Sequence, residues 1–299
     1  MSEVSAIVCT KDRSAAVSRL IASLLADESD VFELIVIDQS EGSETERALE
    51  PLRKDPRLHY RHSSTRGKGA GLNEGIKEAK GDIVVCTDDD CQPPRNWLAN
   101  MAAALESQPT AVIAFCQVLP VAHDRTRGYV PAYLFQKNRL LRSIRAICGG
   151  LGLGAGMAVR RDFAIEIGGF DESFGPGARF PSADEWDLAI RALLKGRHVY
   201  ETAELAIVHD GFRTFEEGFK HARRDWMAIG AVCAKPLRAG HVESLIVPLW
   251  LLTTRALLPP IADLTHLRRP RGLGRIVAFT QGFAEGFATS VDSKTLRFI

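Results

Sequence analysis

The first half of this chain alternates short β-rich runs with stretches that favour helix, and this rhythm restricts the fold more than any other feature. The β-rich runs are residues 4–9, 34–37, 59–61 and 83–86, and helices are expected near residues 14–25, 44–53 and 71–79. Such alternation predicts an α/β fold in which crossover helices join parallel strands. Ligands of these sheets bind outside the carboxyl ends of the strands.

Polar segments follow three of these runs. They are residues 10–13, 38–40 and 88–90, and each stands where a strand is expected to end. Because the carboxyl ends of parallel strands meet at one edge of the sheet, we expect the three segments to converge on one crevice.

The third segment is a run of three carboxylates, Asp88, Asp89 and Asp90. Side chains two apart in an extended chain share a face, so Asp88 and Asp90 can converge on one ion while Asp89 points away. A hard divalent cation would relieve their repulsion and leave positions for phosphate oxygens. The same acids would also suit the N-terminus of a helix expected over residues 94–106, so a capping role stays open from the residues alone.

Composition limits the partners and the compartment. The 299 residues, 45% of them hydrophobic, can bury one large core or two modest ones. Lys and Arg number 38 against 37 Asp and Glu, so net charge gives no argument for nucleic acid, and any anion site must be local. The six cysteines include no C-x-x-C pair and residues 1–8 show no secretory pattern, which favours reduced thiols in the cytoplasm and no zinc site.

The second half is less regular. A strand is expected over residues 111–119, and the basic, aromatic-containing stretch 123–148 is predicted to be an acceptor-side element. The glycine-rich residues 149–156 precede a short strand-like run and do not match G-x-G-x-x-G between strand and helix, so no dinucleotide site is expected. Asp184 and Glu185 open an amphipathic helix, and His209 follows the strand expected over residues 205–208. From the residues alone, helix capping and a structural histidine remain open readings of these positions.

These segments resemble the inverting glycosyltransferases of family two, which have the GT-A fold and use nucleotide-activated sugars. The resemblance spans about residues 4–230, and its most specific part is the stretch 87–93 with Trp97 and Leu98, which is similar to the D-x-D metal motif and the helix after it. It implies a Rossmann-like mixed sheet flanked by helices, followed by a helical C-terminal extension. The expected division is a catalytic domain over 1–235, with a nucleotide half 1–110 and an acceptor half 111–235, and an extension over 236–299.

The resemblance also implies roles for particular residues. The family's Glu-Asp pair stands here inverted, and because the second acid of the pair is the base, Glu185 is the expected base and Asp184 the alternative. Leu72 stands where Arg is frequent, and Lys68 or Arg66 could compensate for it. The implied donor contacts are Thr10, Arg13, Asp38, Lys68 and Asp88, and the implied ligands of Mg²⁺ or Mn²⁺ are Asp88, Asp90 and His209.

An apolar span between Glu243 and Asp263 follows the matched region. Three prolines and Arg255 argue against a simple transmembrane helix, and Arg268, Arg269, Arg271 and Arg275 come directly after it. This pattern favours peripheral contact through residues 244–275 with the inner face of the cell membrane, with a helix pair packed on the catalytic domain or in a homodimer as the alternative.

The expected function is transfer of a sugar from a nucleotide diphosphate to a hydroxyl acceptor, lipid-linked if the membrane contact exists, in cell-surface polysaccharide or glycolipid synthesis. The sequence does not choose between UDP, dTDP and GDP donors. Two alternatives are a sugar-nucleotide pyrophosphorylase and a non-catalytic sugar-nucleotide binder. The segment 10–13 lacks the glycine loop that a pyrophosphorylase would need.

Overall fold

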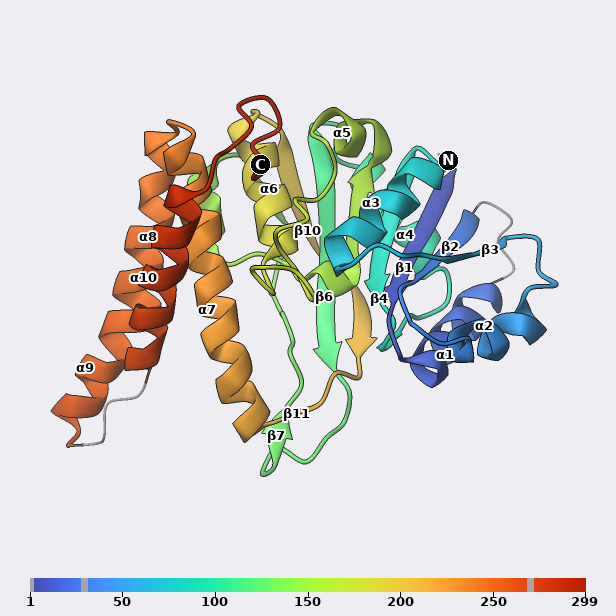
Figure 1. Cartoon of the computed structure of the whole chain (residues 1–299), viewed down its shortest axis with the longest axis horizontal. Helices are drawn as coiled ribbons and strands as arrows, with labels where there is room; N and C mark the ends of the chain where they lie inside the picture. The colour runs from blue at the N-terminus through green and yellow to red at the C-terminus, as the bar shows by residue number, and fades with distance from the viewer. Residues whose placement is uncertain (1–2, 28–31, 268–271) are drawn as a thin grey trace.

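A computed structural model describes residues 3–27, 32–267 and 272–299 (Figure 1). Within these residues, nine strands form one mixed sheet in the order β3-β2-β1-β4-β9-β6-β10-β5, with β8 paired to β10. The strands are β1 (Val4–Thr10), β2 (Phe32–Asp38), β3 (Leu58–His62), β4 (Ile83–Asp88), β5 (Cys91–Gln92), β6 (Ala111–Pro120), β8 (Arg139–Leu141), β9 (Met157–Arg160) and β10 (His198–His209). A separate pair joins β7 (Gly128–Tyr129) to β11 (Arg213–Thr214).

The parallel half of the sheet forms as the alternating rhythm predicts. Strand β1 lies between β2 and β4 and is parallel to both, and β3 is parallel to β2. The register pairs Thr10 with Asp38 and Cys9 with Asp88, so the three polar segments do meet at one edge. Strand β9 runs antiparallel between β4 and β6, which makes the sheet mixed.

Helices cover both faces of the sheet and form a further layer at one side (Figure 1). They are α1 (Ser14–Leu25), α2 (Glu44–Leu49), α3 (Lys68–Glu78), α4 (Trp97–Glu106), α5 (Arg161–Glu166), α6 (Asp184–Leu194), α7 (Phe215–Arg238), α8 (Ile246–Leu251), α9 (Leu258–Thr265) and α10 (Leu273–Ala288). Because successive side chains of a strand point to opposite faces, β2 contributes to two hydrophobic cores. Leu34 and Val36 belong to the core that contains buried residues of α1 and α4, and Ile35 and Ile37 belong to the core that contains buried residues of α3 and α6.

The helical layer consists of α7 to α10. The backbones of α7 and α10 approach so closely that a Cβ at Gly282 would overlap the backbone of Met227, and one at Gly230 would overlap the backbone of Phe279. Only glycine permits this approach. The expected domain boundary at residue 235 falls inside α7, which continues to Arg238.

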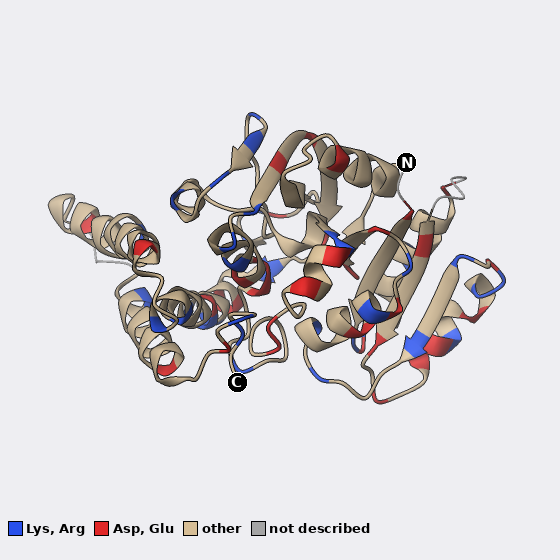
Figure 2. Cartoon of the chain, turned by 90° about the horizontal axis from the view of Figure 1, so that it is seen from above, with Lys and Arg blue, Asp and Glu red and all other residues tan. Residues whose placement is uncertain are grey.

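The outer helical run of this layer, Val242–Thr265, is long and apolar enough to span a bilayer by length and composition, and 28% of its most apolar window is buried against the protein. Seen from above, the outermost helix of this layer has few residues coloured as Lys, Arg, Asp or Glu (Figure 2). Arg268, Arg269 and Arg271 of the expected basic cluster lie outside the described residues. Arg275 is packed rather than free, since its guanidinium lies 5.8 Å over the Trp226 ring.

A cluster of buried charges connects this layer to the sheet. Lys235 on α7 donates to Asp171 at 2.6 Å and pairs with Asp187 on α6. Asp187 also accepts from Arg191 at 2.8 Å, and the backbone N–H of Phe298 donates to Asp171 at 2.8 Å. The Phe298 ring stacks on Phe174, so the C-terminal residues pack against the loop that precedes α6.

Candidate active site

A cavity of about 740 Å³ opens at the carboxyl ends of β1, β2, β4 and β10. Its walls come from residues 9–11, 39–41, 62–68, 88–90 and 176–177, together with Arg13, His209 and Arg213. Its volume lies in the range of small-molecule sites. Segments separated by most of the chain therefore share one pocket, as parallel strand order requires.

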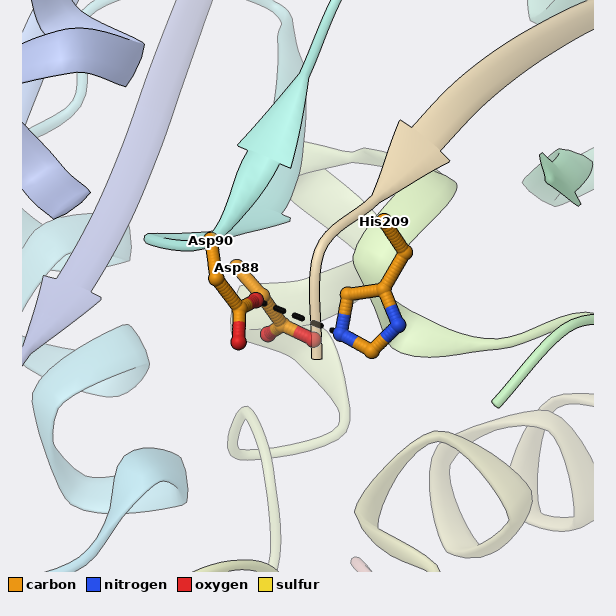
Figure 3. Close-up of side chains that lie close together, drawn as sticks. All are labelled: Asp88, Asp90 and His209. Atoms are coloured by element: carbon orange, nitrogen blue, oxygen red, sulfur yellow. Dashed lines mark ion pairs between the residues drawn. The ribbon is translucent and has the colours of Figure 1, made fainter. Parts of the chain in front are cut away.

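Asp88, Asp90 and His209 form a compact trio at the floor of this cavity (Figure 3). One ligand atom from each lies within 4.8 Å of the others. The pairing of β5 with β10 sets His209 opposite Cys91, which brings the imidazole to the acidic turn. Nε2 of His209 lies 3.2 Å from Asp90 Oδ1, and Nδ1 lies 3.2 Å from the Pro131 carbonyl oxygen.

The trio fits a divalent cation. Asp90 Oδ1 is buried and has no hydrogen-bond partner among the described residues, and the group that faces it is Nε2 of His209, with which it forms an ion-pair contact. Two carboxylates and an imidazole suit Mg²⁺ or Mn²⁺ and leave positions for phosphate oxygens. Burial alone would raise the pKa of Asp90, but His209 and Arg13 outweigh it and lower this pKa to about 2. Burial would likewise lower the pKa of His209, and Asp90 raises it instead.

Strand β4 ends at Asp88 and the chain turns at the next two residues, so these acids do not have the extended geometry expected of them. Asp89 nevertheless lies outside the trio. It is buried and accepts from Thr10 Oγ1 at 2.6 Å and from Arg13 at 2.7 Å. Arg13 also donates to Asp90 at 2.8 Å. Asp89 therefore holds the loop after β1 against the acidic turn. The sequence predicts no role for it beyond its separation from Asp88 and Asp90.

Lys68 lies between the trio and the acid pair of α6. Its ammonium pairs with Asp88, and its backbone N–H donates to the Pro176 carbonyl oxygen at 2.9 Å. Burial alone would lower the pKa of Lys68, but Asp88, Asp184 and Glu185 raise it well above its usual value. Arg66, the other cation considered as a replacement for the missing Arg, also lines the cavity.

Asp184 and Glu185 form the first turn of α6, behind Lys68. Asp184 is buried and Glu185 half-buried, and neither is among the residues that line the cavity. A Cβ built on Gly154 would lie 3.5 Å from Lys68 Nζ and 3.9 Å from Glu185 Oε2, so the lysine and the glutamate both lie beside this glycine. Burial and the Asp184 carboxylate raise the pKa of Glu185 well above its usual 4.5, and Lys68 opposes the shift. The glycine-rich stretch signalled close approach, but sequence reasoning did not assign Gly154 to this pair.

Asp38 lies below the cavity wall. It is fully buried, one oxygen accepts from the Ser40 backbone and hydroxyl at 3.0 and 2.5 Å, and the other accepts from Tyr60 at 2.9 Å. The next residues, Gln39 and Ser40, line the cavity in its place. The expected contact between Asp38 and a nucleobase stays a prediction.

Comparison with known proteins identifies the family. Residues 5–168 match the family described as glycosyl transferase family 2. The chain belongs to this family. Its fold agrees with solved glycosyltransferases, which confirms the expected GT-A architecture with a helical C-terminal part. A mannosyltransferase of Pyrobaculum calidifontis, solved with GDP-Man and Mn²⁺, matches with a TM-score of 0.62 and 20% identity over 96% of this chain and 86% of that one.

Three further proteins are similar to this chain. TarS 1–349 of S. aureus, solved with UDP-GlcNAc, matches with a TM-score of 0.65 and 18% identity over 95% of this chain and 82% of that one. The glucosyl-dolichyl phosphate glucuronosyltransferase of Haloferax volcanii is 24% identical over 75% of this chain and 72% of its own length. The β-monoglucosyldiacylglycerol synthase of Synechocystis is 24% identical over 90% of this chain, which spans 58% of that protein.

Proposed function

We propose that this family 2 protein is a metal-dependent inverting glycosyltransferase that moves a sugar from a nucleotide diphosphate to a hydroxyl. The observation that carries the proposal is the trio Asp88, Asp90 and His209 beside Lys68, which pairs with Asp88 and also interacts with Asp184 and Glu185. A displacement at the anomeric carbon needs charge stabilisation at the leaving group and a base at the attacking hydroxyl. Two charged groups on opposite sides of a sugar would supply both.

On the leaving-group side, Asp88, Asp90 and His209 would hold Mg²⁺ or Mn²⁺, which acts as a Lewis acid towards phosphate oxygens when bound. Lys68 would contact the diphosphate, since its ammonium lies beside Asp88 at the cavity wall. Arg13 and Thr10 line the same cavity and would hold the nucleotide. A contact from Asp38 to the nucleobase would require one of its bonds to Ser40 or Tyr60 to open. As the bond from the anomeric carbon to phosphate oxygen breaks, its electron pair leaves with the nucleotide diphosphate.

On the acceptor side, Glu185 would take the hydroxyl proton while the hydroxyl oxygen bonds to the anomeric carbon from the opposite face. A base works best when its pKa lies near the operating pH, and burial beside Asp184 moves Glu185 in that direction. Asp184 is the alternative base, although it is the more buried of the two.

We further propose a lipid-linked hydroxyl as acceptor and a place on the inner face of the cell membrane, with contact through residues 244–275. The apolar surface of Val242–Thr265 supports this part. Two relatives named above carry dolichyl phosphate or diacylglycerol in their names, which points in the same direction. A homodimer through this surface is the alternative, and no nucleic-acid partner is expected. The pyrophosphorylase and non-catalytic readings are not favoured, since the family and its neighbours are glycosyltransferases.

A thermal-shift screen of UDP, GDP and dTDP with and without Mn²⁺ tests the proposal. Ligand at about a hundredfold above its Kd should add ~2.7 kcal/mol to the free energy of unfolding. We expect one base to stabilise the protein, and Mn²⁺ to increase the effect. The Asp90→Ala variant should lose the metal-dependent part.

The control for that variant is Asp82→Ala, which removes an exposed carboxylate at the other end of β4. It should respond to nucleotide and Mn²⁺ as the parent protein does. If none of the three nucleotides stabilises the parent protein, the donor-binding proposal is wrong.

A further inference from the structure

Exposed aromatic side chains gather where the two-stranded β7–β11 sheet meets the start of α7, a region called the tip below. Phe215 and Phe219 are 49% and 79% exposed. They stand four residues apart, and so share one face of the helix with Arg223. Tyr129 and Phe212 are exposed beside them. A capping box between Thr214 and Glu217 fixes the first turn of α7, so these rings stand on an ordered element rather than on a loose loop.

The tip is also cationic. Five arginines and Lys220 outnumber its four acids. Of these acids Glu216 pairs with Lys220 at 2.9 Å, Glu217 accepts from Thr214, Asp124 accepts from Thr126, and Asp225 follows Arg224 on α7. Its arginines have no ion pair or side-chain hydrogen bond within the described parts of the chain. They are Arg125, Arg127, Arg213, Arg223 and Arg224. Uncompensated guanidinium groups among exposed rings suit the headgroup region of an anionic bilayer, where aromatic rings and Arg both gather.

The tip adjoins the mouth of the donor cavity. Arg213 of β11 lines that cavity, and its chain neighbour Phe212 is exposed. Strands β6 and β10 end at the same end of the molecule, and so does α9, whose Leu264 is exposed (Figure 1). Leu267, just after α9, is 97% exposed. Two separate apolar elements therefore flank the end at which the cavity opens.

We propose that the tip docks on an anionic lipid surface and seats the mouth of the cavity against it, so that the acceptor hydroxyl enters from the plane of the membrane. This identification of the acceptor as membrane-borne rests on the proposed glycosyl transfer, whereas the docking itself does not. The pattern of charge selects a bilayer over a second copy of the chain. Two tips face to face would bring unpaired arginines together, and like charges at an interface oppose association.

Sedimentation of the full chain with vesicles tests the docking. We expect binding to vesicles that contain phosphatidylglycerol, weak binding to pure phosphatidylcholine, and weaker binding to both as salt rises. The Phe215→Ser/Phe219→Ser variant should bind the anionic vesicles about tenfold less tightly. The Arg223→Glu/Arg224→Glu variant should lose about tenfold or more.

Matched controls lie at the opposite end of the molecule. Ile165→Ser removes a 51% exposed apolar side chain from α5, and Lys77→Glu/Lys80→Glu reverses two exposed cations near the start of β4. Both should bind vesicles as the parent protein does. Stabilisation by nucleotide and Mn²⁺ should be the same in all variants, which shows that the tip variants are folded.

Equal vesicle binding by the parent protein and the two tip variants would overturn the proposal, and so would equal losses in tip and control variants. A parent protein that is dimeric in buffer, with tip variants that are monomeric, would assign the tip to a second copy instead. If vesicle binding behaves as expected but no nucleotide stabilises the protein, docking stands and the proposed transfer fails.

Discussion

At the scale of single residues, Lys68 interacts with two groups of acids. Its ammonium pairs with Asp88 and opposes the rise in the pKa of Glu185. If Glu185 is the base, Glu185→Gln should lower kcat by about 10²–10⁴ and leave nucleotide stabilisation unchanged. Lys195→Gln, at the other end of α6, is the control. Unchanged kcat in Glu185→Gln would move the role to Asp184.

The raised pKa of Glu185 also predicts the pH dependence. A base must be deprotonated, so kcat should fall as the pH drops through a pKa above 4.5. The folded chain holds this proton more tightly than the unfolded chain, so stability from this group is full below about pH 4.5 and is lost as the pH rises through the folded-state pKa. In Asp184→Asn one like charge is gone, so the acid limb of the kcat profile should move to lower pH. A limb that stays in place or moves up would contradict the coupling.

The amino-acid sequence predicted the positions of some site residues but not of others, and the difference has a physical cause. The sequence predicted that Asp88 and Asp90 lie together without Asp89, but on the period of an extended strand. In the structure a turn at Asp89 and Asp90 produces this grouping. The saturation of Asp38 by Ser40 and Tyr60 depends on side-chain directions in a folded sheet, which no single position reveals. The meeting of Gly154 with Glu185 likewise depends on tertiary packing.

At the scale of elements, the close packing of α7 on α10 depends on glycine. A Cβ at Gly282 would overlap the Met227 backbone, so Gly282→Ala should lower the free energy of unfolding by about 1–3 kcal/mol. Gly274→Ala is the control on the same helix. A Cβ there meets nothing within 4 Å, and the change should add about 0.5–1 kcal/mol. Chemical denaturation of both variants measures the difference, and equal stability would mean that the helices can separate at no cost.

The sequence predicted best the helices and strands whose hydrophobic pattern is uninterrupted. The helix Ser14–Leu25 has the predicted bounds, whereas β10 begins at His198 rather than near Leu205. The first half of β10 carries Glu201, a charge that argues against a buried strand. In the structure its carboxylate lies 3.1 Å from Arg139 and accepts from the Gly152 N–H at 2.9 Å. Arg139, which is far away in the sequence, thus offsets the cost of burying the Glu201 carboxylate. Local strand propensity does not include such a long-range interaction.

At the scale of the whole molecule, Lys235 joins the helical layer to the sheet. It neutralises Asp171 and Asp187 where water is excluded, so Lys235→Met should cost about 3–5 kcal/mol of stability. Lys220→Met, an exposed lysine of the same helix, should change stability by less than about 1 kcal/mol. Denaturant titration of the pair measures both, and similar losses would show that the buried cluster is not special.

The pairing of His209 with the turn that carries Asp90 joins parts of the chain that are far apart in sequence. Long-range strand pairing closes large loops and is slow, so a complete ligand set arises late in folding. A cation held by the proposed ligands would bind only this finished arrangement and would stabilise the pairing of β5 with β10. Early in refolding, a population would then have secondary structure but no affinity for Mn²⁺. The rate at which Mn²⁺ affinity appears would measure the rate at which β10 pairs with β5.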